Sequence, residues 1–339
     1  MSLKHAIGFE WNKWEDDITT SINVTIQNSY KRTGSYAVRF VCNTSDFFYW
    51  LKLPLAVALS EFYLQFALMF DGALSDTNGI LKWCNGSTVL GGIKLTTDGK
   101  IDFYTGDFAT LVASGSKTLT VGTWYLIEVH VKIADSGGVL ETRVDLVSDA
   151  VYSGDTKPGT AAVVDNLVWG STAQNTGNCY LDDIVVNDTA GEVNNSWPDN
   201  SKVVLLKPTA DGSLLEWTPT PSGSHYSTVD EVPPSGTDYL STQAVDKVDE
   251  FVLEDLPAEA KSIVGVIPEV WAYKGSSNPP TKLALGFDLW GTDYLGSDLN
   301  LGTAQQLAKV IYNVNEKPGG GSFTVADVNN AKLLIKSRS

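Results

Sequence analysis

The sequence predicts an all-β protein built from two sandwich domains. Apolar and polar residues alternate with a period of two in nearly every apolar segment, which is typical of strands with one buried face. Clusters of turn residues such as TTDGK, ADSGG and DTKPG separate these segments. Convincing amphipathic helices are scarce. Many short strands joined by regular turns favour a β-sandwich or jelly roll.

The strongest strand signals lie in the first half of the chain. Residues 62–70, FYLQFALMF, place five apolar side chains on one face. Residues 125–133, YLIEVHVKI, do the same and place Glu128, His130 and Lys132 on the opposite face. The turn TDG between GGIKLT and KIDFYTG predicts a hairpin. We therefore expect half-buried strands whose second face is exposed to water.

A polar, turn-rich segment, NDTAGEVNNSWPDNSK at 187–202, separates two strand series. We expect a jelly roll at 1–190, a linker at 191–201, and a second β-sandwich, concerned with assembly, at 202–339. This second series includes KVVLLKP, EFVLEDL and TKLALGFDLWG. Each domain is long enough to bury a core of its own.

Two segments near the C-terminus need separate treatment. TAQQLAKVIYNV, at 303–314, could be helix or strand, and its β-branched end favours strand. In TVADVNN, Thr324 followed by Asp327 resembles a capping box and predicts a short helix.

Composition excludes several classes of partner. The formal net charge is −16 and the pI is near 4.5. An acidic surface repels phosphate backbones and anionic lipid, so we expect neither nucleic acid nor a membrane as partner. Cys42, Cys84 and Cys179 form no CxxC or Cys/His cluster, which excludes a zinc site and a disulfide framework. This use of cysteine suits assembly in a reducing cytoplasm.

Six segments follow one another in a characteristic order over most of residues 7–188. They are GFEW, GSYAVRF, FYLQFALMF, GGIKLTTDGKIDFYTG, GTWYLIEVHVKI and YLDDIVVND. In this order they resemble a concanavalin A-like jelly roll of the laminin G-like type.

The junction and the start of the second domain, GEVNNSWPDNSKVVLLKPTADGSLLEW and onward to residue 241, are similar to segments of tailed-bacteriophage and prophage virion proteins. Those proteins pair a laminin G-like jelly roll with a C-terminal β domain. The resemblance implies a non-enzymatic structural protein on the virion surface, a capsid decoration or head-fibre protein or a tail appendage. It would bind other virion proteins and itself, as a homo-oligomer. The family has no established catalytic residues to carry over.

Two other functions stay open. A carbohydrate-binding module for host adsorption is the first, because ten tryptophans could stack on sugar rings, although they are also ordinary core residues. A glycan lyase or hydrolase is the second. The carboxylate pattern E-x-D-x-x-E starts correctly only at Glu15, and Thr20 stands at its last position. His5, expected in a tail, His130 and His225 match no catalytic motif. We therefore expect no enzyme activity.

Two aspartates, Asp182 and Asp183, stand side by side in the apolar segment CYLDDIVVND. Regular alternation would put Asp183 on one face with Leu181 and Val185. A buried carboxylate needs a cation, an arginine or backbone N–H groups as partner.

Several sandwich domains that bind glycans close with a similar acidic strand beside a first strand containing FE, and there the acids help to hold a structural calcium ion. Glu10 in GFEW and Asp183 match that pairing. We expect both to meet where the first and last strands adjoin. Either they hold calcium with backbone carbonyls and water, or Asp183 accepts backbone N–H bonds without a metal.

Overall fold

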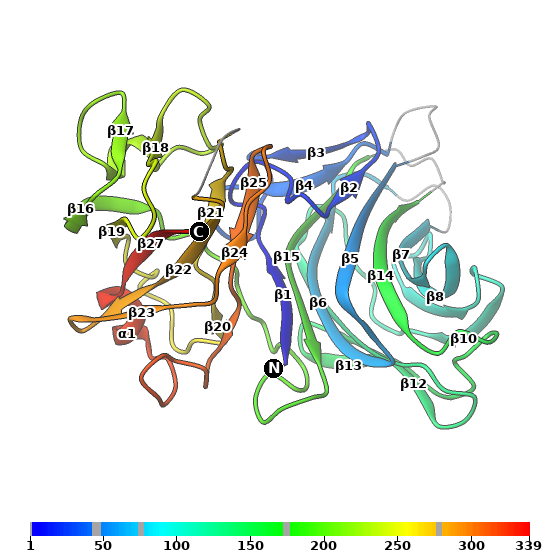
Figure 1. The fold of residues 1–339 in the computed structure, drawn as a ribbon. Coiled ribbons are helices and arrows are strands. Elements are labelled where there is room, and N and C mark those ends of the chain that lie inside the picture. The colour runs from blue at the N-terminus through cyan, green and yellow to red at the C-terminus, as the bar shows by residue number, and fades with distance from the viewer. Residues whose placement is uncertain (1, 43–48, 74–77, 172–176, 276–279) are drawn as a thin grey trace. The chain divides into compact units, whose positions relative to one another are not determined.

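The computed structural model describes residues 2–42, 49–73, 78–171, 177–275 and 280–339. The chain divides into two compact units, Met1–Val203 and Val204–Ser339. The polar segment predicted at 191–201 to link two domains lies within the first unit. The predicted all-β class with sandwich domains is confirmed, since nearly every element is an antiparallel strand (Figure 1).

The first unit is a sandwich of two sheets. Sheet A runs, in order, through β13 (Val147–Gly154), β12 (Gly138–Val144), β11 (Tyr125–Lys132), β6 (Glu61–Phe70), β15 (Cys179–Asp188), β4 (Ala37–Phe40) and β3 (Val24–Gln27), and β1 (Leu3–Ile7) also pairs with β15. Sheet B runs through β10 (Thr110–Ser114), β9 (Ile101–Thr105), β8 (Thr88–Leu95), β7 (Asn78–Asn85), β14 (Val164–Ser171), β5 (Tyr49–Leu59) and β2 (Thr19–Thr20).

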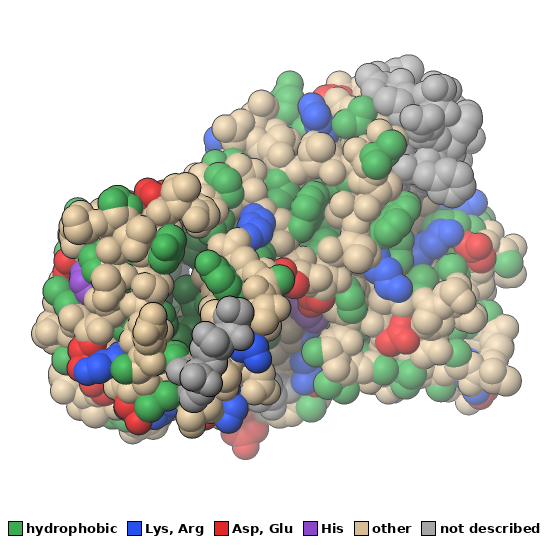
Figure 2. Space-filling model, turned by 45° about the horizontal axis from the view of Figure 1, so that its top comes forward, with side chains coloured by type: hydrophobic (Ala, Val, Ile, Leu, Met, Phe, Trp, Pro, Cys, Tyr) green, Lys and Arg blue, Asp and Glu red, His purple; other side chains and the backbone are tan. Residues whose placement is uncertain are grey.

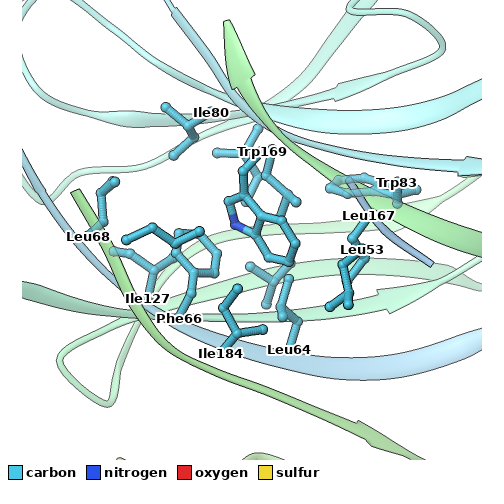
Figure 3. Close-up of a cluster of buried hydrophobic side chains, with 14 of the residues drawn as sticks. Leu53, Leu64, Phe66, Leu68, Ile80, Trp83, Ile127, Leu167, Trp169 and Ile184 are labelled. Carbon is cyan, nitrogen blue, oxygen red and sulfur yellow. The ribbon is translucent and has the colours of Figure 1, made fainter. Parts of the chain in front are cut away.

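The core of the first unit lies between these sheets. The apolar sets predicted in 62–70 and 125–133 both belong to it, which confirms those two strand assignments. Trp169 and Phe66 meet across the core with ring centroids 6.0 Å apart and planes nearly perpendicular (Figure 3). Full burial of one such large side chain contributes about 1.5–3 kcal/mol to stability.

The second unit is built on sheet C, which runs through β16 (Pro208–Leu215), β19 (Val248–Leu253), β27 (Lys332–Arg338), β22 (Lys282–Leu289) and β23 (Thr292–Leu295), with β24 (Leu299–Asn300) also on β22. Three two-stranded sheets complete it: β17 (Thr218–Thr220) with β18 (Tyr239–Ser241), β20 (Gly265–Val266) with β26 (Tyr312–Asn313), and β21 (Glu269–Ala272) with β25 (Gln306–Lys309).

Both predictions for the C-terminal segments are confirmed. The ambiguous segment 303–314 forms β25 and β26, and α1 (Val325–Asn330) follows the N-cap Thr324. Thr324 and Asp327 make the reciprocal bonds of a capping box. Within the described ranges, no helix is long and apolar enough to cross a membrane.

Candidate functional site

The adjacent aspartates lie where β15 bulges. Asp182 pairs with Ala67 and Val185 with Gln65, so β15 has one residue more than β6 between these pairs. Asp183 accordingly has a positive φ of 49°. The expected alternation is wrong at this point, because the bulge leaves Leu181, Ile184 and Val186 on the core side. Both carboxylates lie instead on the outer side of sheet A.

Asp183 is fully buried there and has three donors. Its Oδ2 accepts from Arg32 Nη1 at 2.7 Å, and its Oδ1 accepts from Thr33 Oγ1 at 2.7 Å and from the Val203 amide at 2.9 Å. Asp182, also fully buried, accepts from the amides of Arg32 at 2.9 Å and Thr33 at 3.2 Å. The two acids thereby fix the loop around residues 32–33 to the strand.

Glu10 reaches the same loop from the end of β1. Its Oε2 accepts from the Ser35 amide at 2.7 Å. Burial raises the pKa of Glu10 to about 7, and repulsion from Asp183 adds to the rise. Burial, and then the charge on Asp183, also raises the pKa of Asp182. The first and last strands of the unit are neighbours as predicted, since β1 pairs with β15.

The groups around these acids are hydrogen-bond donors rather than metal ligands. Among the described residues, no group of three or more His, Cys, Asp or Glu side chains could hold a metal ion. The oxygens of Asp182 and Asp183 face N–H and O–H groups, as in the hypothesis without a metal. Calcium at Glu10 and Asp183 stays a prediction, and chelation is its test.

The segment 197–203 covers part of the outer face of sheet A, over β6, β11 and β15. Gln65 on β6 accepts from the Ser201 amide at 2.9 Å and donates to the Ser201 carbonyl at 2.7 Å. Glu128 on β11 accepts from the Asp199 amide at 2.7 Å. Gln65 and Glu128 are both fully buried, so the expected water-exposed face of β11 is wrong in this region.

Trp197, at the start of this covering segment, packs against side chains of sheet A. Arg143 lies 3.9 Å from its ring centroid, and Tyr63 lies 5.1 Å from it. Tyr63 stacks on His130 at 4.2 Å, and His130 Nε2 is 2.9 Å from Glu61. The residues on this face are therefore bonded mainly to one another.

The other two histidines are also structural. His5 lies in β1 with 4% exposure, so the expected tail is wrong: residues 3–7 are a paired strand. His225 precedes a short 3₁₀ helix and its Nδ1 is 2.5 Å from Asp249, which is fully buried.

The outer face of sheet B is different in chemistry. Register places Lys52, Val168, Lys82, Gly92 and Tyr104 in one row across β5, β14, β7, β8 and β9. These positions alternate with core residues, so their side chains point away from the core. In the part of the surface seen in Figure 2, basic and hydrophobic side chains are interspersed in this way.

Phe108 comes from the β9–β10 turn and lies over this row with a positive φ of 55°. A Cβ added at Gly79 or Gly92 would come within 2.6 Å of its ring, so the ring rests against bare backbone. The Tyr104 ring stands nearly perpendicular to it at 5.9 Å. Two glycines thus make the seat for a partly buried aromatic ring.

Two lysines flank the Phe108 ring. Lys82 Nζ lies 4.8 Å from its centroid and Lys94 Nζ 4.9 Å, and Lys94 Nζ is also 4.5 Å from the Tyr104 centroid. Each such contact contributes about 0.5–1 kcal/mol at an exposed site. Lys82 pairs with Asp107 at 2.7 Å, while no ion pair of Lys94 is found within the described part of the chain. We name the set Lys52, Lys82, Lys94, Tyr104 and Phe108 the aromatic–lysine face.

The sequence analysis did not predict this face, because it considered only tryptophans as residues that could stack on sugars. Trp83 and Trp169 are core residues, 1% and 2% exposed. The signal that was available is the pair Gly91–Gly92 inside a strand, since glycine there marks a close approach of another group.

The chain matches no known protein-family model and no curated protein. Among solved structures it is similar to the cellulose-induced protein Cip1, with TM-score 0.45 and 12% identity over 58% of this chain and 100% of that one. It is also similar to domain 4 of AbnA, an extracellular arabinanase from Geobacillus stearothermophilus, with TM-score 0.40 and 13% identity over 55% and 92%.

A third similar structure is the carbohydrate-binding module CBM66 from Bacillus subtilis, with TM-score 0.35 and 11% identity over 51% of this chain and 96% of that one. These are likenesses of fold. The virion role stays a prediction from the sequence resemblance.

Proposed function

We propose that this protein is a non-enzymatic binding protein whose first unit binds carbohydrate on the aromatic–lysine face. The observation that carries the proposal is the Phe108 ring seated on Gly79 and Gly92 beside Tyr104. Sugar rings have apolar C–H faces that pack on aromatic rings, as other apolar surfaces do. Because the turn conformation and the glycine seat already fix Phe108, little ordering is needed when a ligand binds.

The same face supports binding rather than glycoside hydrolysis. Hydrolysis uses two carboxyl groups that flank the scissile bond. On this face Asp107 is paired with Lys82, and Asp102 on β9 is only 9% exposed. The rings and ammonium groups of this face can recognise a ligand but do not supply an acid and a nucleophile.

A panel of polysaccharides, titrated against the full chain by calorimetry or on an array, tests the proposal. Phe108→Ala should weaken binding about tenfold, because one aromatic contact and its buried area are lost. Tyr30→Ala is the matched control, since Tyr30 is a 47% exposed aromatic whose ring is tilted against Tyr180 of sheet A. Equal affinity for wild type and Phe108→Ala, or no binding by wild type to any polysaccharide, would contradict it.

We also propose that this binding acts on a virion surface, as a capsid decoration or head-fibre protein or as a tail appendage. This proposal rests on the resemblance of residues 191–241 to virion proteins that the sequence suggests, and no family model or curated protein matches the chain. Mass spectrometry of purified particles should find the chain, and light scattering should find a homo-oligomer, with a trimer as the expected form. Absence from particles together with a monomeric mass at high concentration would refute the virion role.

A further inference from the structure

We infer that the ligand of the aromatic–lysine face is an anionic polysaccharide, whose sugars carry carboxylate or sulfate groups. The inference rests on the proposed function and adds the charge of the ligand. It comes from the placement of the lysines around the ring on which a sugar would stack.

The two ammonium groups lie over the Phe108 ring. Lys82 Nζ and Lys94 Nζ both lie within 5 Å of the Phe108 centroid, at 4.8 and 4.9 Å. A ligand that approaches the ring therefore meets these two ammonium groups together with the ring. A carboxylate or sulfate there would come within reach of an ammonium group, which gains a charge-assisted hydrogen bond.

Of the two lysines over the ring, Lys82 is paired with an acid, whereas no ion pair of Lys94 is found among the described residues. Asp107 takes up Lys82 at 2.7 Å. Asp102 pairs in register with Lys94 but is 9% exposed, and Asp165 accepts from the Gly86 amide at 2.8 Å. Lys94 Nζ instead lies over two rings, 4.5 and 4.9 Å from their centroids, so its remaining N–H groups can turn to a ligand.

The three lysines of this face stand out because the protein as a whole is acidic. Its 40 acidic residues outnumber 24 basic ones, so an average patch repels an anion. On the aromatic–lysine face, Lys82 and Lys94 lie on the neighbouring strands β7 and β8, and Lys52 lies on β5, beyond β14 in the same sheet. A neutral sugar gains no electrostatic attraction from these lysines. An anionic polysaccharide is attracted by them, although the rest of the acidic protein repels it.

The test compares polymers that differ in charge alone. Full-length protein is titrated with polygalacturonate and its carboxyl-reduced form, and with dextran sulfate and dextran. At least one anionic polymer should bind about tenfold more tightly than its neutral counterpart, a difference that salt should reduce. Preference for the uronate identifies a carboxylate ligand, and preference for dextran sulfate identifies a sulfate ligand.

Lys94→Gln should reduce the preference to less than about twofold, and Lys94→Arg should restore it, since charge is what the inference requires. Lys132→Gln is the matched control, because Lys132 is 43% exposed and belongs to sheet A. Melting temperatures of all variants verify folding. Neutral polymers that bind as tightly as charged ones, or a preference that survives Lys94→Gln, would overturn the inference alone. Binding to none of the four polymers would overturn it as well, and the polysaccharide panel then decides the proposed function.

Discussion

The outer faces of sheets A and B enclose the same core but carry different kinds of side chain. On sheet A, acids and amides are buried under residues 197–203 and bonded to their backbone. On sheet B, lysines and rings are partly buried against one another and, among the described residues, no buried acid is bonded to them. The alternation of a strand shows that a second face exists, but partners from elsewhere in the chain decide whether it is covered. The open face is therefore the one we associate with a ligand.

The largest difference should appear when one acid is removed from each face. Asp183→Ala leaves Arg32 without its buried partner and should lower the free energy of unfolding by about 3–5 kcal/mol. Asp107→Ala removes an ion pair whose aspartate side chain is 66% exposed and should cost less than about 1 kcal/mol. Urea unfolding measures both. Similar costs would contradict the assignment of one face as covered and the other as open.

A chelator tests whether the covered acids Glu10 and Asp183 bind calcium. If the N–H and O–H donors around Asp183 complete its bonding, EDTA leaves the melting temperature unchanged. If calcium is bound at Glu10 and Asp183, EDTA lowers it, and Asp183→Asn abolishes that shift. Differential scanning calorimetry with and without EDTA separates the two hypotheses.

A smaller effect is expected from filling the seat of Phe108. The nearest atoms to a Cβ at Gly79 belong to the Phe108 ring, at 2.6 Å, so Gly79→Ala must push the ring away. Overpacking of this kind costs about 1–3 kcal/mol. Polysaccharide binding should weaken as in Phe108→Ala. Gly159→Ala is the control, because a Cβ there meets nothing within 4 Å. Unchanged binding in Gly79→Ala would show that the seat does not position the ring.

The last effect concerns the dependence of stability on pH. Glu10 has a folded-state pKa of about 7, above its ordinary value of 4.5, so the folded protein binds more protons than the unfolded chain between these values. Its contribution to stability is therefore fully present below about pH 4.5 and is lost as pH rises to about 7. The melting temperature of wild type should fall over this window, and the fall should be smaller in Glu10→Gln. The exposed Glu192→Gln should follow wild type.

The sequence predicts what depends on local pattern. Alternation found the core sets of β6 and β11, and Thr324 with Asp327 found the helix. It missed what depends on contacts between distant residues. The bulge at Asp183 reverses the expected face, and the cover over Gln65 comes from Ser201, 136 residues away. Phe108 was missed for the same reason, since its place depends on glycines in two other strands.

The origin of the Phe108 ring in a turn, and of its seat in bare backbone, separates two tasks within the first unit. Residues 106–109 supply the side chain that would contact a ligand, whereas β7 and β8 supply only a surface for it to rest on. A change at residue 108 alters the contact without touching the packing between the sheets. Substitutions in this turn could therefore change which ligand the sandwich prefers and leave the residues of its core unchanged.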